Sequence, residues 1–138
     1  MARRARTHRA SLRTALLGAG LALAAGAQPP AASFTARQAA LGRIAYEDSC
    51  GSCHRTTLAG VVGEFPELAG AEFRGMWGGR PARELVAYIR VAMPPAGHKP
   101  DEETLTAIAA YILERNGMRA GDTPLTAETD GVITRTPR

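Results

Sequence analysis

The chain has 138 residues, enough for one domain, with 17 basic and 13 acidic residues and a formal net charge of +4. Five of the basic residues are arginines within residues 1–13, so the remainder carries 12 basic and 13 acidic residues, a net charge of about −1. The basic character belongs to the N-terminal segment, and it does not support a nucleic-acid partner for the rest of the chain.

Residues 1–27 have the pattern of a secretory signal peptide. The arginines are followed by an apolar run over residues 15–25, which is too short to span a bilayer comfortably, and by Ala25-Gly26-Ala27. We therefore expect cleavage before Gln28 and export of residues 28–138 to the periplasm. An uncleaved N-terminal membrane anchor is the alternative.

The first predicted helix of the mature chain runs from about Gln38 to Ser49. Thr35 can cap its N-terminus while the Gln38 side chain reaches back, an arrangement known as a capping box. Gly42 and Tyr46 lie one turn apart on the same face. Because a glycine inside a helix costs about 1 kcal/mol relative to alanine, we expect Gly42 to allow the close approach of another helix.

The middle of the chain combines an irregular stretch with a second helix. Residues 51–79 are rich in glycine and show no persistent period, which predicts a functional loop rather than a sheet. A second helix is predicted from Pro81 to Ala92, because proline suits the first turn and apolar residues recur at helical spacing. Met93-Pro94-Pro95 ends it.

The third predicted helix begins at Asp101, where three consecutive acidic residues lie at its positive end, and it stops at Asn116-Gly117. Residues 119–138 show no apolar period, and we expect an extended or disordered C-terminal tail there. The folded domain is accordingly predicted to cover residues 28–118. With three main helices and no convincing strand, the sequence predicts an all-α fold.

The five residues Cys50-Gly51-Ser52-Cys53-His54 form the C-x-x-C-H signature of covalent haem attachment. The two-residue spacer lets both thiols form thioether bonds to vinyl groups of one macrocycle, and His54 follows as the proximal iron ligand. A disulfide across this spacer would stabilise little, a thioredoxin-like pair needs a βαβ context, and a structural zinc site usually needs four ligands. We therefore predict one covalently bound haem c.

Met93 is the predicted second axial ligand of the iron. It ends the second helix, and Pro94 and Pro95 stiffen the backbone that follows. Met76, His98 and an open sixth position are the alternatives. A His/Met pair raises the reduction potential and leaves no place for oxygen or peroxide. This pair favours an electron carrier, without catalytic residues, over a haem enzyme or a gas-binding protein.

From about Gly42 to Gly117, the sequence resembles the class I cytochrome c family. Gly42 and Tyr46 match the motif of the N-terminal helix of that family, and Tyr111 matches the aromatic residue of the C-terminal helix. The resemblance implies that these two helices cross in close contact at the glycine, with a third helix completing the domain around one haem.

The segment Phe65-Pro66-Glu67-Leu68 is similar to the haem loop of the same family. The resemblance implies that the Pro66 carbonyl accepts a hydrogen bond from the ligating imidazole, which fixes the ring. It also implies that Leu68 packs on the haem. Phe65 stands where the family usually has glycine, so the path of the loop is open at this point.

A narrower resemblance is to the cytochromes associated with quinoprotein alcohol dehydrogenases. It is carried by Phe65–Phe73, Met76–Arg80, Met93–Pro95 and Ala110–Gly117. It implies electron transfer from a periplasmic dehydrogenase dependent on pyrroloquinoline quinone toward a terminal oxidase or another cytochrome. A subunit bound to a dehydrogenase complex, with residues 119–138 as a docking strap, is the alternative.

Overall fold

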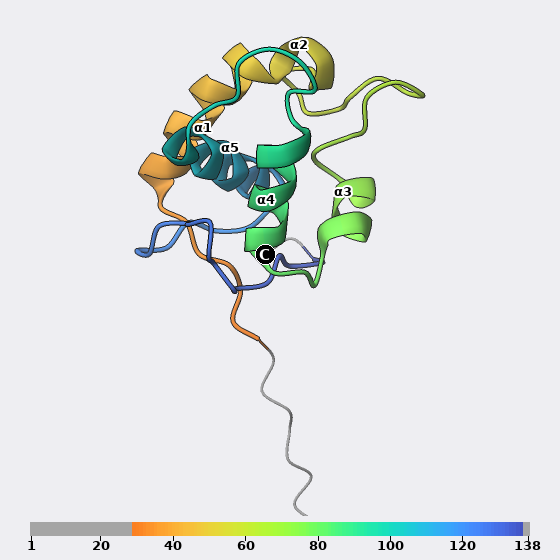
Figure 1. Ribbon diagram of the computed structural model, residues 1–138. Coiled ribbons are helices and arrows are strands. Elements are labelled where there is room, and N and C mark those ends of the chain that lie inside the picture. The colour runs from red at the N-terminus through yellow and green to blue at the C-terminus, as the bar shows by residue number, and fades with distance from the viewer. Residues whose placement is uncertain (1–28, 137–138) are drawn as a thin grey trace, which may run out of the picture.

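The computed structural model describes residues 29–136, and the predicted signal peptide lies outside these residues. Five helices follow in chain order: α1 (Ala36–Ser49), α2 (Gly51–His54), α3 (Ala71–Trp77), α4 (Ala82–Ala92) and α5 (Glu102–Arg115). Between residues 29 and 136, β-structure is limited to three isolated bridges. The prediction of an all-α fold is confirmed (Figure 1). No helix in this range has the length and apolar character that a membrane span requires.

The three predicted helices correspond to α1, α4 and α5, while two short helices occupy the stretch where a loop was expected. The helix α2 has four residues and α3 has seven. Neither is long enough to display a hydrophobic period, which needs a window of at least about 11 residues. The segment between them, residues 55–70, is the irregular loop of this region.

The predicted capping box at α1 is only half present. The Thr35 hydroxyl accepts a hydrogen bond from the Gln38 N–H at 3.1 Å. The Gln38 side chain does not reach back as predicted, because it donates to the Leu125 carbonyl and accepts from the Leu125 N–H, both at 2.8 Å. At the start of α5, the Asp101 carboxylate caps the helix by accepting from the Thr104 N–H at 2.8 Å.

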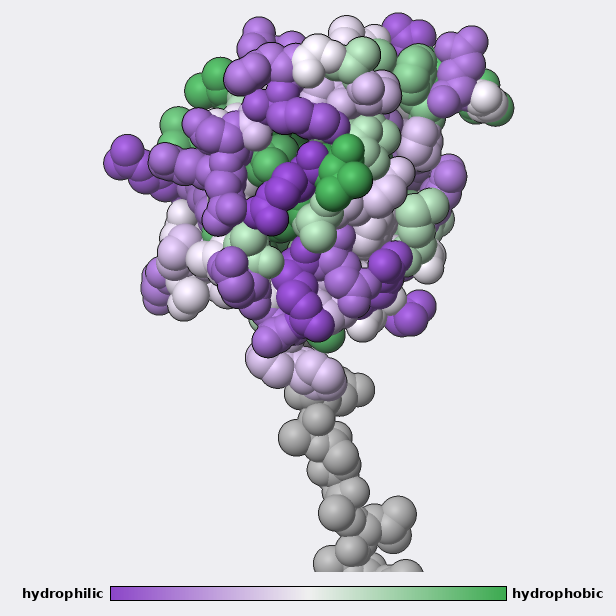
Figure 2. All heavy atoms as spheres, viewed as in Figure 1, coloured by the Kyte–Doolittle hydropathy of each residue, from purple (hydrophilic) through white to green (hydrophobic). Residues whose placement is uncertain are grey.

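The core forms where α1 packs on α5, the two helices seen side by side in Figure 1. A Cβ at Gly42 would overlap the Ala107 carbonyl of α5. The expectation that Gly42 permits close helix contact is therefore confirmed. One turn later the Tyr46 ring packs against Tyr111 with 5.4 Å between ring centroids. Hydrophilic residues cover most of the face shown in Figure 2, with a small apolar group near its centre.

The C-terminal segment, residues 119–136, runs as extended chain against the helices (Figure 1). The disordered alternative does not describe it, since Leu125 and Ile133 are only 2% and 1% exposed. The Ile133 N–H donates to the Arg80 carbonyl at 2.9 Å, and the Ala32 N–H donates to the segment at 2.9 Å. Because two widely spaced side chains and backbone hydrogen bonds hold this segment in place, its sequence shows no regular apolar period. The packed domain thus extends beyond the predicted end at residue 118.

Candidate functional site

A cavity of about 330 Å³ lies between the 55–70 loop and helices α2 to α5. Its lining is mostly apolar, and its volume is in the range typical of ligand sites. All the residues predicted to hold a cofactor line this one cavity: Cys50, Cys53, His54, Pro66, Leu68 and Met93. The fold thus brings these residues together from three separate parts of the sequence.

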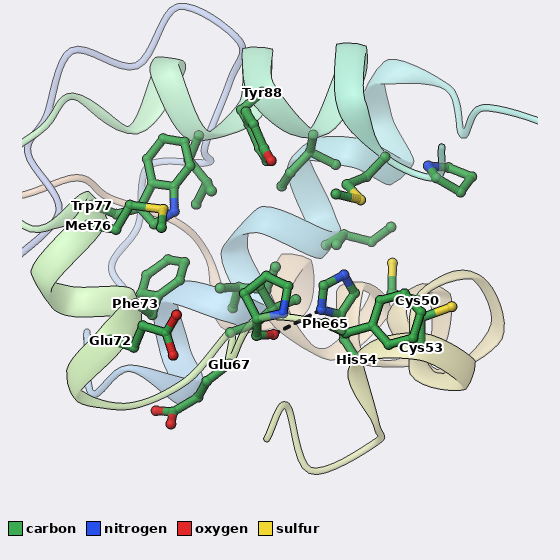
Figure 3. Close-up of a pocket in the computed structure, with 18 of the residues that line it drawn as sticks. Cys50, Cys53, His54, Phe65, Glu67, Glu72, Phe73, Met76, Trp77 and Tyr88 are labelled. Atoms are coloured by element: carbon green, nitrogen blue, oxygen red, sulfur yellow. Dashed lines mark hydrogen bonds between the residues drawn. The ribbon is translucent and has the colours of Figure 1, made fainter. Parts of the chain in front are cut away.

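The two cysteines and His54 lie at one end of the cavity (Figure 3). The helix α1 ends at Ser49, and the Cys50 carbonyl then accepts from the His54 N–H at 2.9 Å to form the single turn of α2. Burial, and secondarily the neighbouring Cys53 thiol, raises the pKa of the Cys50 thiol to about 11. A thiol that stays protonated at neutral pH does not suit a thioredoxin-like redox pair, which depends on a thiolate.

The His54 imidazole is buried and has a defined tautomer. Its Nδ1 lies 3.1 Å from the Pro66 carbonyl oxygen. Because a carbonyl can only accept, Nδ1 must carry the proton, and the Nε2 lone pair is left free to bind a metal. The hydrogen bond that the family resemblance implied is present, although Phe65 replaces the usual glycine.

The structure separates the candidates for the second axial ligand. Met93 caps the C-terminus of α4, is half-buried and lines the cavity. Met76 also lines it, but Met76 is 55% exposed and lies beside Trp77, at the end away from Cys50 (Figure 3). His98 is exposed and is not among the lining residues. The arrangement favours Met93.

Aromatic side chains form much of the rest of the wall, and their packing against one another could not be read from the sequence. The Trp77 ring packs between Phe73 and Tyr88, with centroid distances of 6.4 and 5.5 Å. Phe65 stands edge-on to the His54 imidazole at 6.0 Å. The only available signal was the concentration of aromatic residues between positions 65 and 88 in a chain with few aromatics.

The lining as a whole fits a large, planar, apolar macrocycle attached at one edge. Two thiols stand at one end for covalent attachment, a single imidazole offers nitrogen to iron, and aromatic and aliphatic side chains cover the remainder. Sulfur and imidazole ligands suit iron and do not suit Mg²⁺ or Ca²⁺, which prefer oxygen. The cavity therefore fits haem c.

Comparison with known proteins identifies one matching family and one similar solved structure. The family described as cytochrome c oxidase, cbb3-type, subunit III, matches residues 37–112, more than half of the 138 residues. No curated protein matches the chain. A solved structure similar to it is the sulfane dehydrogenase SoxCD from Paracoccus pantotrophus, with 25% sequence identity and a TM-score of 0.53. The similarity covers 73% of this chain and 52% of that chain, so it spans about half of the SoxCD chain.

The matched residues extend from α1 into α5 and include the whole C-x-x-C-H motif and Met93. Together with the all-α architecture, the match establishes the class I cytochrome c fold and implies binding of haem c. The family match supports an electron-carrier role rather than catalysis. The chain belongs to the family of cytochrome c oxidase, cbb3-type, subunit III, and is an electron-transfer cytochrome of the c type.

Proposed function

We propose that residues 28–138 form an exported monohaem cytochrome that carries single electrons in the periplasm. The electrons pass from a dehydrogenase to an acceptor such as a terminal oxidase or another cytochrome. One observation carries the proposal: His54, whose Nε2 is free, lines the same apolar cavity as both thiols and Met93. This set would supply two covalent attachment points and two iron ligands for one haem.

Each of these side chains has a separate task. Cys50 and Cys53 would hold the macrocycle covalently, His54 and Met93 would bind the iron, and Leu68 would pack on the haem and help to exclude water. The haem supplies a one-electron iron couple. Because His54 and Met93 would both bind the iron, electrons would enter and leave without a bound substrate. The His/Met combination favours a raised reduction potential.

We place a dehydrogenase dependent on pyrroloquinoline quinone as the donor. The support is the pattern of Phe65–Phe73, Met76–Arg80, Met93–Pro95 and Ala110–Gly117. The likeness to a sulfane dehydrogenase agrees with a dehydrogenase partner in general. The test is the rate at which purified dehydrogenases of different cofactor type reduce the oxidised cytochrome. Reduction by a quinoprotein alcohol dehydrogenase much faster than by other types supports this donor, and equal rates contradict it.

The alternative of a subunit bound within a dehydrogenase complex is favoured by the likeness to SoxCD. The C-terminal segment does not favour it as a docking strap. Its two most buried side chains, Leu125 and Ile133, are already packed into the core of this domain. They are not available to a partner, and we therefore prefer the free carrier. Co-purification from the native host separates the two cases.

The central test is the optical spectrum of the exported protein. We expect a mass equal to the polypeptide from Gln28 onward plus one haem, and a low-spin reduced spectrum that carbon monoxide does not change rapidly. The Met93→Ala variant should lose the sulfur-to-iron charge-transfer band of the oxidised protein and bind carbon monoxide quickly. A five-coordinate reduced spectrum of the unaltered protein would contradict the carrier, and survival of the band in Met93→Ala would contradict the ligand assignment.

A further inference from the structure

Asn116, the residue directly after α5, is a buried polar side chain that none of the proposed haem contacts uses. It is 2% exposed. Its Oδ1 accepts from the Gly70 N–H at 3.0 Å, and its Nδ2 donates to the Leu68 and Ile112 carbonyls, both at 2.9 Å. All the hydrogen-bonding groups of the amide except one oxygen lone pair are therefore engaged.

The chemistry of this contact requires an amide. The three backbone partners comprise one N–H and two carbonyls, so a matching side chain must offer one acceptor and two donors. Leucine offers neither, and an aspartate would place a charged acceptor against the Leu68 and Ile112 carbonyls. Leaving buried backbone groups unpaired costs about 1–3 kcal/mol each. The structural role of Asn116 is thus specific to its chemistry.

The contact reaches the haem side through a short path. Asn116 bonds to the loop at Leu68 and Gly70, 48 and 46 residues away in the sequence. Two residues before Leu68 is Pro66, whose carbonyl accepts from His54. The Leu68 N–H is itself held by the Leu58 carbonyl at 2.8 Å. The segment that carries the Pro66 carbonyl is therefore held at Leu68 by two hydrogen bonds, one from Asn116 and one to Leu58.

We propose that Asn116 is a positioning residue for the proximal iron ligand, because it fixes the loop that aims the Pro66 carbonyl at His54 Nδ1. The proposal depends on the proposed function in that His54 binds the iron. A strong hydrogen bond at Nδ1 makes the imidazole a more basic ligand, which stabilises ferric iron. Loosening the loop weakens this bond and raises the midpoint potential.

The experiment compares two variants of the holoprotein, Asn116→Leu and Gln38→Leu. Gln38 is a matched control, since its side-chain amide also bridges a distant backbone segment through two hydrogen bonds, but to Leu125, and it does not line the cavity. We expect both variants to lower the thermal midpoint of unfolding. Only Asn116→Leu should raise the midpoint potential of the haem. Only this variant should also speed exchange of the His54 Nδ1 proton with solvent, and the exchange rate should rise about tenfold if one net hydrogen bond is lost.

The results distinguish the inference from the function on which it depends. If the unaltered protein lacks covalent haem or histidine ligation in its spectra, the proposed function fails. If it has both and Asn116→Leu changes only thermal stability, as Gln38→Leu does, the positioning role is overturned.

Hydrogen exchange of the unaltered holoprotein decides the question if Asn116→Leu does not fold. The Gly70 N–H, which donates to Asn116, and the His54 Nδ1–H should share the same protection and the same response to denaturant. Free exchange at Gly70 beside a protected His54 proton would overturn the inference.

Discussion

The two sides of the cavity are built differently. On the His54 side, the imidazole is buried. The loop beside it is held by the Gly60 N–H, which donates to the His54 carbonyl at 3.0 Å, and by the hydrogen bonds of Asn116. On the Met93 side, the segment 94–100 is largely exposed. There the Lys99 ammonium donates to the Val91 and Pro94 carbonyls at 2.9 and 2.8 Å.

This difference teaches where the site can change. The proposed proximal ligand, His54, is held by partly buried hydrogen bonds whose loss leaves backbone groups unpaired, whereas the proposed distal ligand, Met93, is followed by a solvent-exposed segment. Hydrogen bonds exposed to water are worth less than buried ones, because water replaces them. We therefore expect ligand loss to begin at Met93 while His54 stays bound.

Replacing each ligand should give the largest contrast. We expect His54→Ala to abolish or nearly abolish covalent haem incorporation, because the motif loses its metal ligand beside the thiols. Met93→Ala should keep the haem in similar amount and only open the sixth position. Haem staining after denaturing electrophoresis measures this. Equal yields of holoprotein from the two variants would contradict the comparison.

A methyl group at Gly60 should strain the proximal side strongly. Gly60 has φ +62°, and a Cβ there would overlap the Phe65 and Pro66 carbonyls. Gly63 is the matched control, with φ +80° and open space where a Cβ would lie. We expect Gly60→Ala to lower the free energy of unfolding by about 3 kcal/mol or more and Gly63→Ala by about 1. Guanidinium unfolding of the holoprotein measures both, and equal losses would show that close packing does not matter here.

The only lysine of the chain tests the distal side. Lys99→Met should free the Val91 and Pro94 carbonyls, which lie on either side of Met93 in the sequence. Carbon monoxide should then bind the reduced protein a few-fold faster, because exposed hydrogen bonds contribute about 1 kcal/mol or less. Arg90→Met is the control, because it removes an equal charge from an exposed pair with Glu102. Stopped-flow mixing measures the rate of carbon monoxide binding. The same rate in both variants would show that Lys99 does not stabilise the Met93 side.

The smallest effect is expected from the cap of α5, at the end of the distal segment. The hydrogen bonds that Asp101 accepts from Thr104 hold the pKa of its carboxyl below the usual value. A lowered folded-state pKa means that the stabilisation is present above the unfolded pKa and is lost as the pH falls through the folded one. Asp101→Asn should therefore flatten the acid limb of the stability curve slightly. An unchanged acid limb would show that titration of this carboxyl does not contribute to stability.

The parts of the fold and site that could be predicted are local in the sequence. The period and caps of α4 and α5 lie within the helices themselves, and the close contact at Gly42 could be expected because a glycine at a helix interior needs a reason. The prediction for the Gln38 side chain is wrong, because its partner Leu125 is 87 residues away. The helix α3 escapes prediction because seven residues carry too little pattern.

The sequence by itself determined the C-x-x-C-H motif on which the proposed haem attachment depends, since Cys50 to His54 are contiguous and one helical turn suffices to set their spacing. The tertiary structure decided that Met93 rather than His98 lines the cavity, and that Asn116 holds the loop beside His54. It also decided that the C-terminal segment is packed, with Ile133 in the core. The physical reason is the same in each case: these contacts join residues far apart in the chain, and only the packing of α1 on α5 and of the loops around them brings such residues together.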